Sequence, residues 1–156
     1  MHATWSKRGC QPQVPVTGAR KSVKVFGCID IISAKFTYDI TDGMFNTQTY
    51  LEFLEKIAKK YHRNKVLYIQ DNVSYHKDRE AWDWFKDNRK WLEVYNLPPY
   101  SPEFNATERL WHYTRISGTH NRYFDSRDSL LETLERIFTG MQKDKTRIIG
   151  YLKPFL

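Results

Sequence analysis

The chain of 156 residues contains few cysteines and no long apolar segment. Its two cysteines, Cys10 and Cys28, have neither the spacing of a metal-binding motif nor that of a disulfide framework, which fits a reducing cytoplasm. No apolar run approaches the roughly 18 residues of a membrane span, and residues 1–15 lack the apolar core of a signal peptide. Internal repeats and low-complexity segments are also missing from the sequence. We therefore expect a single soluble, cytoplasmic domain with no membrane partner.

The charge is unbalanced towards the positive sign. There are 25 Lys and Arg residues against 18 Asp and Glu, which gives a net charge of +7 and a pI near 9.4. A surplus of this kind favours contact with a polyanion such as nucleic acid, although an inert basic surface has the same composition. With 40% hydrophobic and 15% aromatic residues, the chain can build one packed core.

The hydrophobic pattern predicts strands and helices that alternate after an irregular segment, residues 1–22. Alternating apolar residues favour an antiparallel hairpin at the start, and a period of 3.6 residues favours helices further on. Gly140 is expected to end the last helix, which leaves residues 141–156 as a C-terminal tail. This order suggests an α/β fold with a mixed sheet covered by helices. The expected strands are 22–32, 34–41, 66–69 and 91–97, and the expected helices begin near residues 46, 78, 105 and 126.

One candidate site follows the expected strand 66–69. Asp71 stands just beyond the carboxyl end of that strand, where open α/β sheets usually bind ligands. Asn72 and His76, in "DNVSYH", add an amide and an imidazole close by. The same residues would also suit an Asx-turn, and a single histidine beside a strand end more often makes a local hydrogen bond than binds a ligand.

A second candidate site lies in "LPPYSPEFNATERLW", residues 97–111. Asn105 and Glu108 have the spacing of a capping box, in which each side chain bonds to a backbone amide of the other residue. A helix cap does not need a rigid segment before it, however, and three prolines stiffen the backbone just before Asn105. Rigid placement is what a carboxylate needs when it binds a metal ion, so Glu108 is also a candidate ligand.

Together, "QDNVSYH" and "LPPYSPEFNATERLW" resemble the catalytic core of bacterial transposases of the insertion-sequence 630 type, within the Tc/mariner superfamily of DDE transposases. The 36 residues between Asp71 and Glu108 are similar in number to the spacing in that superfamily. "TWSKRGCQP", "FGCID" and "THNRYF" also resemble family segments and occur in family order. The resemblance covers nearly the whole chain.

The resemblance implies a ribonuclease-H-like fold and metal-dependent cleavage and transfer of DNA strands, at transposon ends and at a target. In the family, three carboxylates hold two Mg²⁺ (or Mn²⁺) ions, and here Asp71 matches the second and Glu108 the third. Mg²⁺ is a hard cation that prefers such oxygen ligands. The residues expected to support these ligands or to contact DNA are Asn72, His76, Asn105 and Arg109.

The sequence departs from the family at the first catalytic Asp, for which this chain has no counterpart. In the family that residue ends the first strand, shortly before the segment that matches "HATWSKRG". We therefore expect a partial catalytic domain over residues 1–156 that lacks its first, central strand and is inactive alone. Asp30, Asp39 and Asp42 are weak substitutes, because Asp30 ends a different strand and the others lie in or beyond the hairpin.

Two further interpretations stay open. The missing parts can come from an upstream transposase polypeptide or a homodimer, or the chain can be a non-catalytic, DNA-binding regulator derived from a transposase. Trp82, Trp84, Trp111 and Tyr113 could stack on bases, although aromatic residues on amphipathic helices more often belong to the core.

Overall fold

The computed structural model describes residues 8–9 and 21–156, so most of the segment 1–22 lies outside the described residues. Within the described part, no helix combines the length and the apolar character needed to cross a bilayer. Strands and helices alternate after an N-terminal hairpin, as the hydrophobic pattern predicts. The strands are β1 (Lys24–Asp30), β2 (Lys35–Thr41), β3 (Val66–Gln70) and β4 (Leu92–Asn96), and the α-helices are α1 (Thr47–Tyr61), α2 (Arg79–Asn88), α3 (Ala106–Thr114), α4 (Arg127–Lys143) and α5 (Thr146–Leu152).

The four described strands form two separate sheets rather than the single mixed sheet expected from the element order. β1 and β2 are antiparallel, with Gly27 opposite Tyr38, and β3 and β4 are parallel, with Gln70 opposite Asn96. The α/β class and the hairpin are therefore confirmed, and the continuous sheet is not. No backbone ladder joins β1 to β3 among the described residues, so side-chain packing has to hold the two sheets together.

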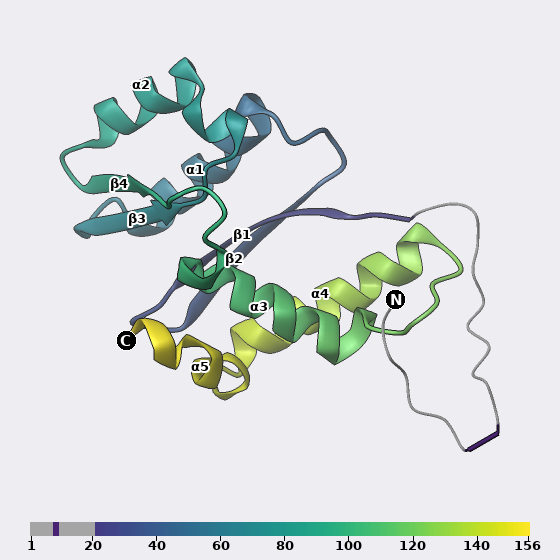
Figure 1. Ribbon diagram of the computed structural model, residues 1–156. Coiled ribbons are helices and arrows are strands. Elements are labelled where there is room, and N and C mark those ends of the chain that lie inside the picture. Colours follow the sequence, from purple (N-terminus) through teal and green to yellow (C-terminus); the bar gives the residue numbers. More distant parts are fainter. Residues whose placement is uncertain (1–7, 10–20) are drawn as a thin grey trace.

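Helix α1 provides that packing because it contacts both sheets. Its buried Tyr50 and Phe53 share one hydrophobic core with Phe26 of β1 and Tyr68 of β3. The Phe26 and Phe53 rings stack with 5.5 Å between their centroids, and burying each such side chain stabilises the fold by about 1.5–3 kcal/mol. Figure 1 shows α1, α2, β3 and β4 on one side of the hairpin, with α3, α4 and α5 on the other.

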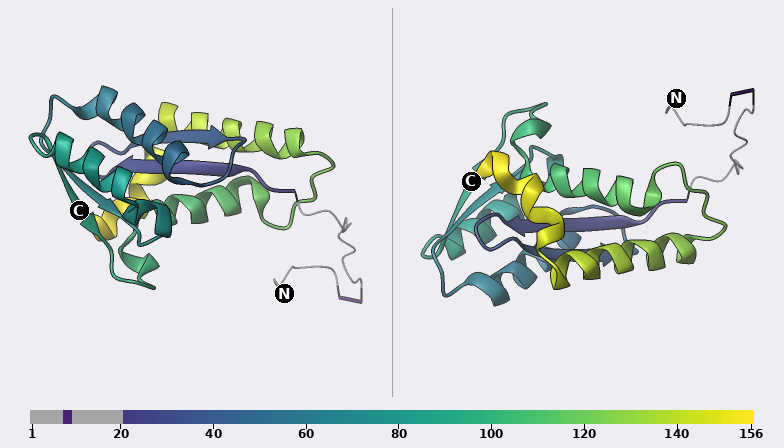
Figure 2. Two further views of the ribbon diagram at one scale, coloured as in Figure 1. Left: turned by 90° about the horizontal axis from the view of Figure 1, so that it is seen from above. Right: turned by 90° about the horizontal axis from the view of Figure 1, so that it is seen from below.

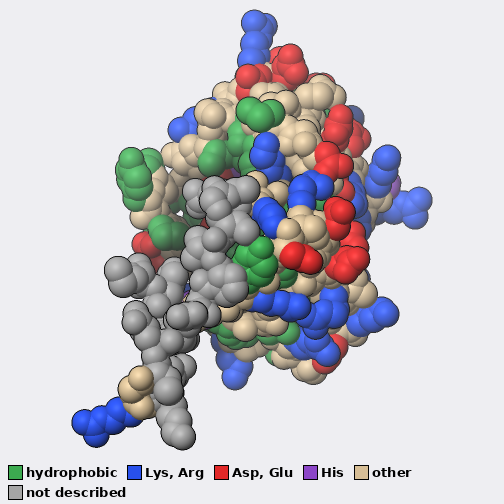
Figure 3. All heavy atoms as spheres, turned by 90° about the vertical axis from the view of Figure 1, so that its right-hand side faces the viewer, with side chains coloured by type: hydrophobic (Ala, Val, Ile, Leu, Met, Phe, Trp, Pro, Cys, Tyr) green, Lys and Arg blue, Asp and Glu red, His purple; other side chains and the backbone are tan. Residues whose placement is uncertain are grey.

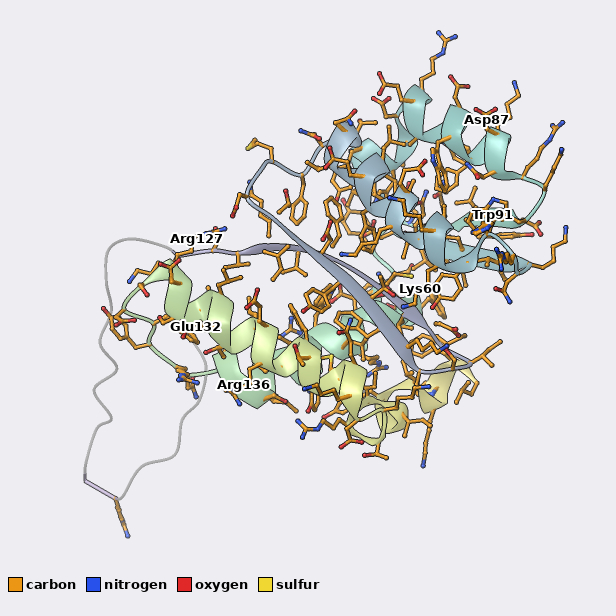
Figure 4. The ribbon with its side chains drawn as sticks, turned by 180° about the vertical axis from the view of Figure 1, so that it is seen from behind. Lys60, Asp87, Trp91, Arg127, Glu132 and Arg136 are labelled. Carbon is orange, nitrogen blue, oxygen red and sulfur yellow. The ribbon has the colours of Figure 1, made fainter. Side chains whose placement is uncertain are left out.

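The other face of the hairpin is covered by the three C-terminal α-helices. Phe36 of β2 packs there against Leu110 of α3, Phe138 of α4 and Ile148 of α5. Figure 2 shows α3 and α4 running along the hairpin. At the start of α4, Arg127 forms an ion pair of 2.5 Å with Asp42, just beyond β2 (Figure 4).

Helix α3 approaches β1 closely because Gly27 has no side chain. A Cβ atom at Gly27 would lie 2.6 Å from Cη2 of Trp111, well inside normal contact distance. The Trp111 ring is held edge-to-face by Phe36 and Phe138, with centroid separations of 6.0 and 6.2 Å. This contact fixes the position of the helix whose first turn carries Glu108.

Residues 141–156 are not the tail that the sequence led us to expect. Gly140, expected to end the helix, lies inside α4, which continues to Lys143, and α5 follows directly. Met141, Ile148 and Leu152 are fully buried in the second core. Burial of these side chains outweighs the roughly 1 kcal/mol that a glycine costs inside a helix, so the last turn of α4 forms despite Gly140.

Candidate functional site

A solvent-open pocket of about 180 Å³ lies where the ends of β3 and β4 meet the start of α3. β3 and β4 are parallel, so their carboxyl ends share one edge, and the Leu97 amide extends the pairing by donating to the Gln70 carbonyl at 2.8 Å. The structure therefore brings together Asp71, Asn72, Asn105 and Glu108, which local patterns proposed separately and the family resemblance proposed as one site. The pocket is lined by Asp71, Asn72, Leu97, Pro98, Tyr100, Ser101, Pro102, Asn105 and Glu108.

Asp71 is half-buried and carries a polar atom without a satisfied hydrogen bond. Its Oδ1 lies 2.9 Å from His76 Nδ1, yet it makes no hydrogen bond of acceptable angle among the described residues. The same His76 nitrogen is 3.1 Å from the Asp71 carbonyl oxygen, which places a proton on Nδ1. The pKa of Asp71 is therefore lowered, first by the His76 side chain and then by the Val73 backbone, with burial opposing.

His76 is buried behind Asp71 and does not line the pocket. Its ring packs against Tyr50, with 4.2 Å between centroids, and meets Tyr75 edge-to-face at 4.7 Å. The structure thus places His76 in local contact with the carboxylate rather than on an exposed surface, which leaves no direct route to DNA.

A buried polar link that the sequence analysis missed joins the ends of the two strands. The Tyr50 hydroxyl donates to Gln70 Oε1, and Gln70 Nε2 donates to Asn96 Oδ1 at 2.7 Å. The only sequence signal is a glutamine at the last position of an otherwise apolar strand. The link keeps Asp71 and Leu97, the next residues along the chain, at neighbouring positions.

Glu108 lies in the first turn of α3, and its side chain is free of the capping role considered above. Asn105 is the N-cap and accepts from the Thr107 amide at 3.0 Å, but its own amide donates to the Pro102 carbonyl at 3.1 Å. The reciprocal half of the capping box is therefore not formed. Within the described part of the chain, no hydrogen bond or ion pair is found for the Glu108 carboxylate.

The proline-rich segment before α3 forms a tight turn followed by a short 3₁₀ helix, Pro102–Phe104. Tyr100, in this turn, has a φ of 58° and is fully exposed. The Ser101 hydroxyl donates to the Pro99 carbonyl at 3.3 Å. Prolines fix their own φ angles, so the turn presents the pocket wall with little backbone freedom.

The other candidate acids lie elsewhere and are already engaged. Asp30 accepts hydrogen bonds from Ser33 and Ile32 at the turn of the hairpin. Burial acts to raise the pKa of Asp30, but these hydrogen bonds outweigh it and the pKa is lowered. Asp39 is paired with Lys56 and Asp42 with Arg127. None of the three acids lines the pocket.

The aromatic and basic residues considered as DNA contacts include both partly buried and exposed side chains. Trp111, Tyr113 and Trp84 are partly buried against the two cores, whereas Trp82 is 41% exposed. Arg109 is exposed on α3 and does not line the pocket. Figure 3 shows a face on which Lys and Arg side chains are interspersed with Asp and Glu rather than gathered into one basic surface.

The donor set fits a hard divalent cation in part. Asp71, Asn72 and Glu108 line one pocket, and carboxylate oxygens are the ligands that such a cation prefers. However, no group of three or more His, Cys, Asp or Glu side chains suited to a metal ion occurs in the described residues. The pocket therefore offers two carboxylate ligands.

Comparison with known proteins gives two kinds of match. The family model of the DDE superfamily endonucleases matches residues 1–131. The Insertion element IS630 uncharacterized 39 kDa protein of Shigella sonnei is 30% identical over 83% of this chain, and the Transposable element Tcb2 transposase of Caenorhabditis briggsae is 28% identical over 59%. The aligned segments span only 38% and 34% of those two proteins. No solved structure matches the chain.

Proposed function

This chain belongs to the DDE superfamily endonuclease family, and from that premise we propose that it is part of the catalytic domain of an insertion-element transposase. Its reaction would be metal-dependent cleavage and transfer of DNA strands, at the ends of the element and at a target. A chain with this activity would work on chromosomal DNA in the bacterial cytoplasm.

The observation that carries the proposal is the shared pocket of Asp71 and Glu108. These residues are separated by 36 residues in sequence, come from different elements, and line one solvent-open pocket. Glu108 is not consumed by a structural role, because the capping box is not formed. Asp71 lines the pocket, while its buried Oδ1 lies 2.9 Å from His76 Nδ1. Two acids in one pocket supply part of a metal site.

The roles of the individual residues follow from their contacts. Asp71 and Glu108 would hold Mg²⁺ or Mn²⁺ ions, which in such sites activate the attacking water or 3′-hydroxyl and stabilise the leaving 3′-oxygen. His76 Nδ1 donates to the Asp71 carbonyl and lies 2.9 Å from Asp71 Oδ1, which would keep the carboxylate in place. Asn105 fixes the start of α3, and Asn72, on the pocket wall, has an amide that can donate to phosphate.

We further propose that the fold is ribonuclease-H-like and that the two sheets are halves of one mixed sheet. Two features support this. Helix α1 packs in one core with residues of β1 and β3, and no ladder joins these two strands in the described part of the chain. The outer edge of β2 is closed by side chains, since Lys56 donates to the Tyr38 carbonyl and Gln142 to the Phe36 carbonyl. A strand between β1 and β3 would complete the sheet.

That strand, and the third carboxylate with it, would come from a segment outside the described residues. It could belong to a longer form of this protein, to an upstream transposase polypeptide or to a second copy. Two carboxylates alone hold each ion weakly, so we expect the isolated chain to cleave DNA slowly or not at all.

The alternative function is regulatory: the chain would occupy transposon DNA, or pair with an intact transposase, without cutting. The net charge of +7 favours DNA binding in either case. The test is to mix the purified chain with Mg²⁺ or Mn²⁺ and a duplex that carries the terminal repeats of its element. Cleavage that Asp71→Ala or Glu108→Ala abolishes supports the enzyme. Because the isolated chain is expected to cleave slowly or not at all, the assay is repeated with an upstream transposase polypeptide that carries the first catalytic Asp. Salt-sensitive binding without cleavage in that mixture supports the regulator, and absence of binding contradicts both.

A further inference from the structure

Tyr100 is the most exposed large hydrophobic side chain of the described residues, with a relative exposure of 101%. Most other aromatic side chains of the chain contribute to one of the two cores. A single exposed tyrosine is common on protein surfaces and needs no explanation by itself. Two further features of Tyr100 do need one.

The first feature is its backbone. Tyr100 has a φ of 58°, in the left-handed region that glycine adopts freely and that costs other residues about 1 kcal/mol or more. Ala34 and Asn121 also have a positive φ: Ala34 lies in the turn between β1 and β2, and asparagine tolerates this conformation. A glycine at position 100 would make the same turn with less strain. The turn by itself therefore does not require a tyrosine.

The second feature is its position. Tyr100 lines the same pocket as Asp71 and Glu108, and Pro98, Pro99 and Pro102 surround it in the sequence. Prolines limit the conformations of the free chain, so little further entropy is lost when a ligand contacts the ring. The ring is thus a preorganised flat surface beside the two carboxylates.

The pocket indicates the kind of ligand. A volume of about 180 Å³ is smaller than the roughly 300–1,000 Å³ of sites that enclose a whole small molecule. An open pocket of this size suits one segment of a longer ligand. A nucleobase on a DNA strand offers a flat π face for the ring, while its phosphates lie near the acid site.

We propose that Tyr100 is a stacking platform for an unpaired nucleobase next to the phosphate that the acid site addresses. The inference rests on the proposed function, since it assumes that DNA occupies the pocket. Stacking of this kind accepts any base, because every base has a π face. It would hold a terminal nucleotide out of the duplex, at the point where the strand is to be cut.

The test compares two DNA substrates by fluorescence anisotropy in Ca²⁺. One duplex is fully paired, and the other has the same length with its terminal nucleotides mismatched and therefore unpaired. Tyr100→Ala should weaken binding of the unpaired duplex about 5- to 150-fold, the range of base–aromatic stacking, and should leave the paired duplex unchanged. Tyr100→Phe should bind both as the wild type does.

Two controls separate the ring from its surroundings. Phe104, 59% exposed in the same segment but outside the pocket lining, should tolerate Phe104→Ala with no change in either affinity. Tyr100→Gly, which relieves the strain but removes the ring, should lose as much affinity as Tyr100→Ala. Photo-crosslinking of 5-iodouracil at the unpaired position should modify Tyr100.

The outcomes separate the stacking role of Tyr100 from the proposed function of the chain. If the wild type binds both duplexes and Tyr100→Ala binds the unpaired one equally well, or loses both affinities equally, the stacking role is wrong and the proposed function stands. If the wild type binds neither duplex, the proposed function fails and the stacking role with it.

Discussion

The contact between Gly27 and Trp111 predicts a strong effect from one added methyl group. In Gly27→Ala the new Cβ would lie 2.6 Å and 2.7 Å from two carbons of the Trp111 ring, whereas carbon atoms pack best at about 3.5–4.0 Å. The ring would have to retreat by about 1 Å. Phe36 and Phe138 both contact the Trp111 ring, so the ring cannot move alone and α3 has to shift away from β1.

Overpacking of this kind typically costs about 1–3 kcal/mol of unfolding free energy. For a domain of this length, that corresponds to a melting temperature lower by about 2–12 °C. Thermal unfolding followed by circular dichroism measures the change. Gly150→Ala is the matched control: its Cβ would meet no atom within 4 Å, and a helical alanine should raise stability by about 0.5–1 kcal/mol.

A double-mutant cycle identifies the cause. Trp111→Phe removes the ring atoms that collide with residue 27, so the penalty of Gly27→Ala should shrink in that background, with a coupling energy of about 0.5–3 kcal/mol. If Gly27→Ala melts at the same temperature as the wild type, or if the losses of stability in Gly27→Ala and Trp111→Phe simply add in the double variant, the collision with Trp111 is not the cause.

Three further predictions concern single groups. Burial raises the pKa of Cys28 to about 12, so in a Cys10→Ser background its thiol should resist a disulfide reagent at pH 8 until denaturant is added; rapid native labelling would contradict this. His76→Phe should raise the pKa of Asp71, seen in the carboxyl carbon shift on acid titration. The pKa of Asp71 is lower in the folded state than in the unfolded state. Its contribution to stability is therefore present above the pKa of the unfolded state and is lost as pH falls through the pKa of the folded state. If His76→Phe leaves the titration of Asp71 unchanged, the His76 contact is refuted. Ile148→Ala should lower the free energy of unfolding by about 2–5 kcal/mol, measured by denaturant titration. If residues 141–156 were a solvated tail, the substitution would leave that free energy unchanged.

Much of the local structure could be predicted because short-range chemistry decides it. The hairpin follows from alternating apolar residues, and Asn46 and Asp78 cap α1 and α2 as their positions before apolar helical stripes suggest. The approach of Asp71 to Glu108 follows from a different kind of evidence. The resemblance to a family, rather than any local pattern, indicated that they belong together.

What escaped prediction depends on tertiary contacts. Gly140 looks like a helix end, but burial of Met141 carries α4 past it. The spacing of Asn105 and Glu108 fits a capping box, yet the Pro102 carbonyl takes the Asn105 amide, which leaves the glutamate free. Tyr100 gave no sequence signal of its own, since its positive φ is visible only in the folded turn.

The central claim, that Asp71 and Glu108 form one metal-binding pocket, is tested most directly by titrating the ¹⁵N-labelled chain with Mn²⁺. Paramagnetic broadening should appear first at the amides around Asp71 and Glu108, and either Asp71→Asn or Glu108→Gln should abolish it. Glu103→Gln changes an exposed acid close by that does not line the pocket, and it should leave the broadening intact. Broadening that is centred elsewhere, or that survives both pocket substitutions, would contradict the account.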